Sequence, residues 1–230
     1  ASEAITRSDS DCNGSEDDVI TTEADARLDG SSTTSALGTS IAGGHDIDDD
    51  GFTDLLVGIP GSSTVAIFSG IPDAESLDLD DALLVASVDA PSSLFGQSVA
   101  FVDDFTGDGS IEMAIGEPML STGAGGTGRV TIALGPLDGS ESGDLASVSV
   151  DAVPGEHLGS VVEYLGSPGA GIAQIAAAGT SKIFGSSGVM VIQASTGGDR
   201  ILTSIVTEIG GTASGDDFGQ AILGGIDVNG

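Results

Sequence analysis

The hydrophobic residues of this chain fall into short, β-branched runs bounded by Gly, Pro, Ser or Asp. Such runs are typical of β-strands about five residues long, and no convincing amphipathic helical period lies between them. The pattern predicts three sets of four strands, at residues 39–43, 54–58, 64–69 and 83–89, then 98–102, 112–116, 129–134 and 146–150, then 160–164, 175–179, 189–193 and 202–207. Residues 77–82 are the one stretch that could form a short helical turn, and residues 24–29 resemble the outermost strand of a preceding set.

The three sets are copies of one sequence unit. LGTSIAGGHDIDDDGFTDLLVGIP from Leu37 aligns without a gap with FGQSVAFVDDFTGDGSIEMAIGEP from Phe95, and further copies begin with LGSVVEYLGS at Leu158 and FGQAILGGIDVNG at Phe218. The copies start about sixty residues apart, which is a period for one multi-strand unit. Four strands per unit without an intervening helix describe the blade of a β-propeller. The predicted fold class is therefore all-β, a β-propeller of four-stranded blades.

The number of predicted blades indicates whether this chain can form a closed propeller ring. A propeller needs about four to eight blades, whereas this sequence offers three full blades, a leading fragment and a fourth unit that stops early. Unless the two end fragments combine into one blade, the chain forms part of a ring. It also begins at Ala1 without an initiator Met, so we expect it to be a segment of a longer product.

Composition narrows the possible partners. Five Lys and Arg stand against 36 Asp and Glu, for a formal charge of −31, so binding of nucleic acid through a basic surface is excluded. Hydrophobic residues make up 39% of the chain, which is enough for a folded core. The one long uncharged stretch contains Pro, Gly and Ser in a pattern of turns, so no transmembrane segment is predicted.

Chemistry concentrates in the loop between the first two strands of the first unit. Asp46, Asp48, Asp50 and Asp54 occupy loop positions 1, 3, 5 and 9, with Gly at position 6. Oxygens that converge in this way suit calcium, and the residue at position 7, Phe52, would contribute its backbone carbonyl. A helix–loop–helix site would need Glu at position 12, where this chain has a valine within a strand. Magnesium and a metal-free acidic turn are the remaining alternatives.

The other units repeat this loop unequally. The second unit supplies a weaker candidate set, made of Asp104, Thr106, Asp108, the carbonyl of Ser110, and Glu112. The third unit has Ser167, Gly169, Gly171 and Ile175 at these places, and without a carboxylate it should hold no metal. The fourth begins correctly with Asp227 and Asn229, after which the sequence ends.

With these motifs in view, the repeats resemble FG-GAP repeats, which build the seven-bladed β-propeller of integrin α subunits and occur in bacterial secreted or surface proteins. The resemblance covers residues 23–230, with blades starting near 37, 95, 158 and 218. It implies a seven-bladed parent ring, calcium as cofactor at the loops of the first two units, and an extracellular, secreted or cell-surface location. Leu37 and Leu158 depart from the family's Phe, and AGTS replaces its GAP sequence in the third unit.

The leading residues 1–22 form a separate acidic linker. The stretch SDSDCNGSEDD resembles the end of a Cys-containing, Asp-rich metal-binding motif of bacterial extracellular proteins. A single cysteine, Cys12, cannot form an internal disulfide. If the resemblance is correct, Cys12 pairs with a cysteine upstream of Ala1, which would indicate an oxidising compartment.

Catalysis is not predicted. His45 and His157 are the only candidates for a base near neutral pH, and both are expected to be surface residues. No nucleophile elbow, phosphate-binding loop or zinc motif occurs in the sequence. The favoured function is a non-catalytic, calcium-binding module for adhesion or recognition of an extracellular protein or polysaccharide. A propeller domain of an extracellular hydrolase or lyase, and an inert spacer, are the alternatives.

Overall fold

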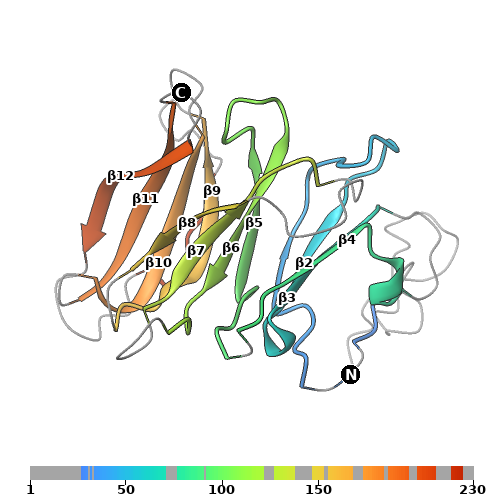
Figure 1. Cartoon of the computed structure of the whole chain (residues 1–230), viewed down its shortest axis with the longest axis horizontal. Helices are drawn as coiled ribbons and strands as arrows, with labels where there is room; N and C mark the ends of the chain where they lie inside the picture. Colours follow the sequence, from blue (N-terminus) through green and yellow to red (C-terminus); the bar gives the residue numbers. More distant parts are fainter. Residues whose placement is uncertain are drawn as a thin grey trace, which may run out of the picture.

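The computed structural model is all-β, and its strands form three four-stranded sheets side by side (Figure 1). The structure describes residues 27–30, 32, 34–70, 77–90, 92–121, 127–137, 147–152, 155–167, 173–183, 186–196, 201–210 and 219–224. Within these residues there is no α-helix. The strands of the three sheets are β1 (Ser40–Ala42), β2 (Leu55–Ile59), β3 (Thr64–Phe68) and β4 (Leu84–Ser87); β5 (Ser98–Asp103), β6 (Ile111–Glu117), β7 (Arg129–Ala133) and β8 (Ser147–Asp151); β9 (Leu158–Gly166), β10 (Gln174–Ile183), β11 (Ser186–Thr196) and β12 (Ile201–Gly210).

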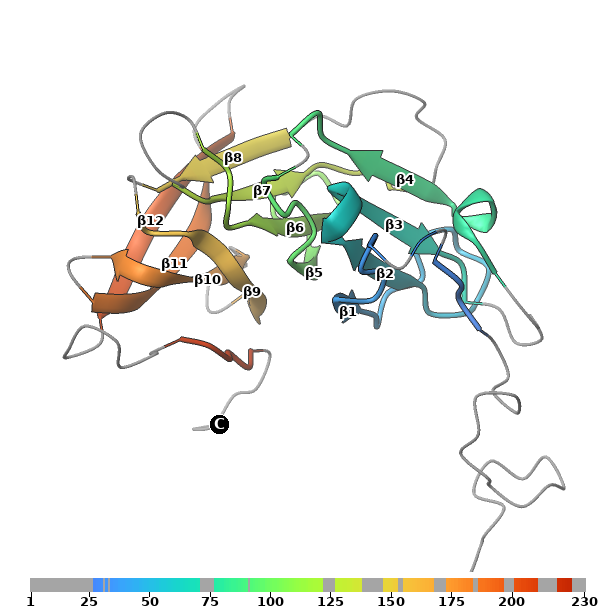
Figure 2. The ribbon, with the colours of Figure 1, turned by 90° about the horizontal axis from the view of Figure 1, so that it is seen from below.

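Each sheet follows the order of the chain and is antiparallel throughout. Seen from below, the sheets form an arc with β1, β5 and β9 on its inner side and the fourth strands on its outer side (Figure 2). This arrangement is that of consecutive propeller blades around an axis. The prediction of four-stranded β-propeller blades in a partial ring is confirmed.

The boundaries differ most in the third blade, where β9 to β12 are nine to eleven residues long. Pairing of β10 with β11 continues to Ile183 and Ser186, beyond the predicted end at residue 179, and the register shifts after Gly179. An irregularity of this kind adds a residue to one strand and cannot be read from alternation alone.

The sequence predicts a leading strand before the first blade and a helical turn within it, and the structure contains the turn and part of the strand. The helical turn is confirmed as η2 (Leu79–Asp81), a 3₁₀ turn that Asp78 caps. Of the proposed leading strand at 24–29, the described part forms one parallel bridge, between Leu28 and Leu77. A second 3₁₀ turn, η1 (Pro60–Ser62), was not predicted.

The core lies between the blades. One cluster joins the first two blades through residues such as Leu56, Ile67, Phe101 and Met113, and another joins the second and third. The residues that open the second and third units, Phe95 and Leu158, are buried in these two clusters at 3% and 0% exposure. Leu158 therefore takes the place in the third unit that Phe95 takes in the second.

A hydrogen bond repeated between neighbouring blades holds the inner strands together. Ser40 donates its hydroxyl to the carbonyl of Gly96 at 2.9 Å, and Ser98 does the same to Gly159 at 2.9 Å. Each serine lies opposite a glycine on the second strand of its own blade. The third blade has Val161 at this position and packs it in an apolar cluster instead.

No helix within the described residues is long and apolar enough to cross a membrane. The acidic stretch 1–22 and Cys12 lie outside the described residues.

Candidate metal centres

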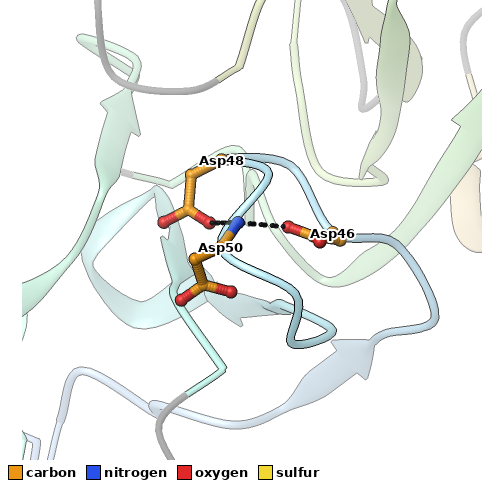
Figure 3. Close-up of side chains that lie close together, drawn as sticks. All are labelled: Asp46, Asp48 and Asp50. Carbon is orange, nitrogen blue, oxygen red and sulfur yellow. Dashed lines mark hydrogen bonds between the residues drawn. The ribbon is translucent and has the colours of Figure 1, made fainter.

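The two acidic loops occupy the same place in consecutive blades, each connecting the first strand to the second. In the first blade the loop begins after β1 and ends at β2, and the amide of Asp54 donates a hydrogen bond to the carbonyl of His45 at 2.6 Å, which closes the loop at its base. Positive φ angles at Asp49 and Gly51 let the backbone coil within the loop. The coil turns alternate side chains toward a common point (Figure 3).

Three carboxylates of the first loop come together. One oxygen each of Asp46, Asp48 and Asp50 can be chosen so that all lie within 4.8 Å of one another. The amide of Asp50 donates to Asp46 Oδ1 at 3.1 Å and to Asp48 Oδ1 at 3.2 Å (Figure 3). Oxygens on opposite sides of a bound calcium are about 5 Å apart, so the spread of these oxygens fits one calcium ion.

Further contacts hold the Asp50 carboxylate at this point. Its Oδ1 accepts from the amide of Phe52 at 2.8 Å, and its Oδ2 accepts from the Ser69 hydroxyl at 2.9 Å. Phe52 is 48% exposed, so much of this residue faces solvent. Ser69 follows β3, and its contact could not be predicted from the spacing within the loop because it joins residues 19 positions apart.

Asp54 lies apart from the cluster. Its side chain is 1% exposed, and its carboxylate accepts hydrogen bonds from the amide of Ile47 at 2.6 Å and from the amide of Gly70 at 2.9 Å. These bonds tie the loop to the end of β3. In this structure the residue at position 9 therefore anchors the hairpin and is not part of the group of converging oxygens.

The second loop also brings three carboxylates within 4.8 Å, those of Asp104, Asp108 and Glu112. Glu112 is completely buried and accepts hydrogen bonds from the amide of Phe105 and, at 3.0 Å, from the hydroxyl of Thr106. The first of these bonds matches the bond from Ile47 to Asp54 in the first loop. The longer glutamate side chain reaches both the anchoring amide and the cluster.

The remaining residue of the predicted second set is Ser110, whose amide donates to Asp108 Oδ1 at 2.8 Å. This backbone hydrogen bond is the main reason why the pKa of Asp108 is lowered. Asp108 is thus held as an exposed, ionised carboxylate at the mouth of the loop.

The buried side of the second loop is electrostatically costly without a cation. Burial raises the pKa of Glu112, the bonds from Phe105 and Thr106 oppose this effect, and the charges of Asp108 and Asp104 add to it. Asp104 Oδ1 is buried and has no hydrogen-bond partner. A buried, unpartnered carboxylate oxygen is rare and destabilising, and a cation among the three carboxylates would remove both penalties. The donor set fits a hard divalent ion.

The corresponding loops of the third and fourth units offer no carboxylate cluster within the described residues. Ile175 is fully buried in β10, and the Ser167 hydroxyl lies 3.1 Å from the hydroxyl of Tyr164. Gly169, Gly171, Asp227 and Asn229 lie outside the described residues.

Both histidines are partly exposed, and each also contacts a neighbouring blade. The side chain of His45 is 24% exposed, lies 3.5 Å from Asp103 and packs edge-on against Phe101. His157 Nδ1 lies 3.0 Å from the carbonyl oxygen of Pro118. The sequence could not reveal these contacts because each joins residues from two different blades.

Four-stranded antiparallel blades that carry carboxylate loops between their first and second strands define a repeat protein of the β-propeller class. The family model for the FG-GAP repeat matches residues 37–70, which span the first acidic loop and β1 to β3. The chain therefore carries an FG-GAP repeat, as the resemblance of its repeated units indicated. A search of curated proteins finds no match.

Proposed function

We propose that this chain is a calcium-binding, non-catalytic β-propeller module of a secreted or cell-surface protein that recognises an extracellular protein or polysaccharide. The observation that carries the proposal is the buried, unpartnered Oδ1 of Asp104 beside Asp108 and the fully buried Glu112. Calcium is the natural occupant because every side chain at this point offers oxygen and none offers nitrogen or sulfur.

The repetition of the loop supports an architectural role for the metal. Carboxylate clusters that share loop positions 1 and 5 stand at the same connection in two consecutive blades, whereas catalytic residues form a single unlike set. A calcium ion at each place would fix the start of the second strand against the end of the first. The net charge of −31 keeps the surface hydrated and suits a calcium-rich exterior.

Removing charge from the first loop tests the metal's role there. We expect Asp48→Asn with Asp50→Asn to reduce the number of calcium ions bound from two to one in a calorimetric titration, because two of three converging carboxylates become neutral. Asparagine keeps an oxygen to accept the bonds from the amides of Asp50 and Phe52. In chelator the melting temperature should therefore change little.

The matched control is Asp49→Asn. Asp49 lies in the same loop, is exposed, and is not one of the converging carboxylates. Its φ of 60° is one that asparagine readily adopts. This variant should still bind two ions. Equal loss of binding in the control, or unchanged stoichiometry in the double variant, would remove the first loop from the proposal.

A further inference from the structure

A cavity of about 390 Å³ lies between the second and third blades, and the metal proposal gives it no role. Its polar wall is made of Gln97, His157 and Ser160, together with Gln220 from the following unit. Gln97 lies directly before β5, and Ser160 lies near the start of β9. The acidic loops instead follow the ends of β1 and β5, so this interblade cavity and the carboxylate clusters lie at opposite ends of the blades.

The rest of the wall is apolar, and no Asp, Glu, Lys or Arg lines the interblade cavity, although the chain contains 36 acidic residues. The apolar wall includes Leu94, Met119 and Val161. Met119 is 47% exposed, and its flexible thioether can adapt to an apolar group. A charged group in the cavity would lose water without gaining an opposite charge. The walls therefore favour an uncharged ligand with an aliphatic part.

The polar wall offers two side-chain amides that are not used within the protein. At the third residue of the first and third units, Thr39 and Ser160 each donate their hydroxyl to the carbonyl three positions earlier, at 2.7 and 3.0 Å. The second and fourth units have Gln97 and Gln220 at this place. Within the described part of the chain, neither glutamine side chain forms a hydrogen bond. A primary amide both donates and accepts, so each can pair with the N–H or the C=O of a peptide group.

Hydrogen bonds hold the walls of the interblade cavity in place. His157 Nδ1 lies 3.0 Å from the carbonyl oxygen of Pro118. Because a carbonyl only accepts, Nδ1 carries the proton, and Nε2 of the neutral ring is then an acceptor. The amide of Met119 donates to the carbonyl of Ser93 at 2.9 Å, and the amide of Gln97 closes its own turn. Walls that are positioned before a ligand arrives favour binding.

We propose that the interblade cavity binds an uncharged peptide segment of a protein partner, with an aliphatic side chain against the apolar wall and a peptide group hydrogen-bonded to Gln97 and Gln220. The cavity is near the lower limit of ligand-site volumes, so it accommodates about one residue. A sugar ring would bring hydroxyl groups against the aliphatic wall, which costs their hydration. The inference rests on the recognition part of the proposed function, selects a protein over a polysaccharide, and does not depend on calcium at the loops.

Methyl NMR of methionine provides a local test, because Met119 lines the cavity while the other two methionines, Met113 and Met190, are 0% and 5% exposed. The full chain, labelled with ¹³C at its methionine methyl groups, is titrated with N-acetyl-leucine methylamide, N-acetyl-aspartate methylamide and N-acetylglucosamine. Met119→Leu assigns the signal. We expect a saturable shift of the Met119 signal with the leucine probe alone, while the other two signals stay in place.

Variants of the glutamines identify the polar contacts. Gln97→Ala and Gln220→Ala should each weaken binding of the leucine probe about fivefold, the loss of one hydrogen bond. Thr39→Ala changes the same repeat position in the first unit, does not touch the cavity, and should leave binding unchanged.

Four results would overturn the inference: no shift with any probe, an equal response to the aspartate probe, a response to N-acetylglucosamine in place of the leucine probe, or equal effects of Gln97→Ala and Thr39→Ala. Melts of the same samples in calcium and in chelator test the metal proposal separately, because none of the clustered carboxylates lines the interblade cavity.

Discussion

Replacing Gly116 with alanine is expected to destabilise the protein by about 3 kcal/mol, the upper range for overpacking a core. A Cβ on Gly116 would lie 2.0 Å from the carbonyl oxygen of Gly159 and 2.3 Å from Ser98 Oγ. Ser98 already donates to that carbonyl. Since the nearest atom is the backbone of the next blade, no side-chain rotation relieves the clash, and the second and third blades must separate.

Thermal or denaturant unfolding of Gly116→Ala measures this effect, with Gly43→Ala as control. Gly43 does not have a positive φ, and a Cβ there would come no closer than 3.4 Å, to the carbonyl oxygen of Asp54. The control should remain within about 1 kcal/mol of the parent chain. If both variants were equally stable, the close approach of the blades at Gly116 would be refuted. Gly58, with 2.1 Å to the Gly96 oxygen, should behave as Gly116 does.

Glu112→Gln is expected to have opposite effects in calcium and in chelator. A calcium ion bound at the second loop would stabilise the folded state by about 2.7 kcal/mol when the calcium concentration is a hundred times its Kd. In calcium the variant loses one charged ligand of that ion, and so it should lose most of this stabilisation. In chelator the variant removes a buried charge that lies close to those of Asp104 and Asp108. The glutamine can accept from the Phe105 amide and donate to the Thr106 hydroxyl, so stability should be retained or increased.

The direction in which stability changes with pH in chelator follows from the same side chain, Glu112. Burial raises the pKa of Glu112 in the folded protein, so the folded state favours the protonated form. In chelator, this contribution to stability is present below the unfolded pKa of about 4.3 and is lost as the pH rises through the raised folded pKa. Melts of Glu112→Gln in chelator should lack this loss.

Glu117→Gln is the matched control. Glu117 is 2% exposed and its pKa is also raised by burial, but it faces Arg129 and Asp151 and belongs to neither carboxylate cluster. Its substitution should change stability by the same amount in calcium and in chelator. A similar independence from calcium in Glu112→Gln would contradict a metal at the second loop.

The strands could be predicted from the sequence because each blade is a local unit. Short apolar runs and a sixty-residue period suffice to place every strand of β1 to β12, usually to within one or two residues. The longer strands of the third blade escaped prediction because their ends depend on register shifts within the sheet.

At the candidate metal loops, the spacing of acidic residues in the sequence predicts only part of the observed geometry. The i, i+2, i+4 pattern of Asp46, Asp48 and Asp50 was enough to predict that they converge. It could not predict that Asp54 is used by two backbone amides. The residue types ranked the second loop as the weaker set, and they could not show that Asp104 has a buried oxygen without a hydrogen-bond partner.

Contacts between blades were beyond sequence reasoning altogether. The serine hydroxyls that hold neighbouring blades, and the contacts of Asp103 with His45 and Tyr164, join residues about sixty positions apart. Their geometry is set by how two blades dock and not by either segment alone.

Calcium titration of the intact chain by calorimetry, with thermal melts in calcium and in chelator, tests the central claim most directly. Two bound ions per chain and a melting temperature that rises with calcium concentration are the predicted result, because a ligand that binds only the folded state stabilises it. Absence of binding heat together with identical melts in calcium and chelator would contradict the account and leave the two loops as acidic turns.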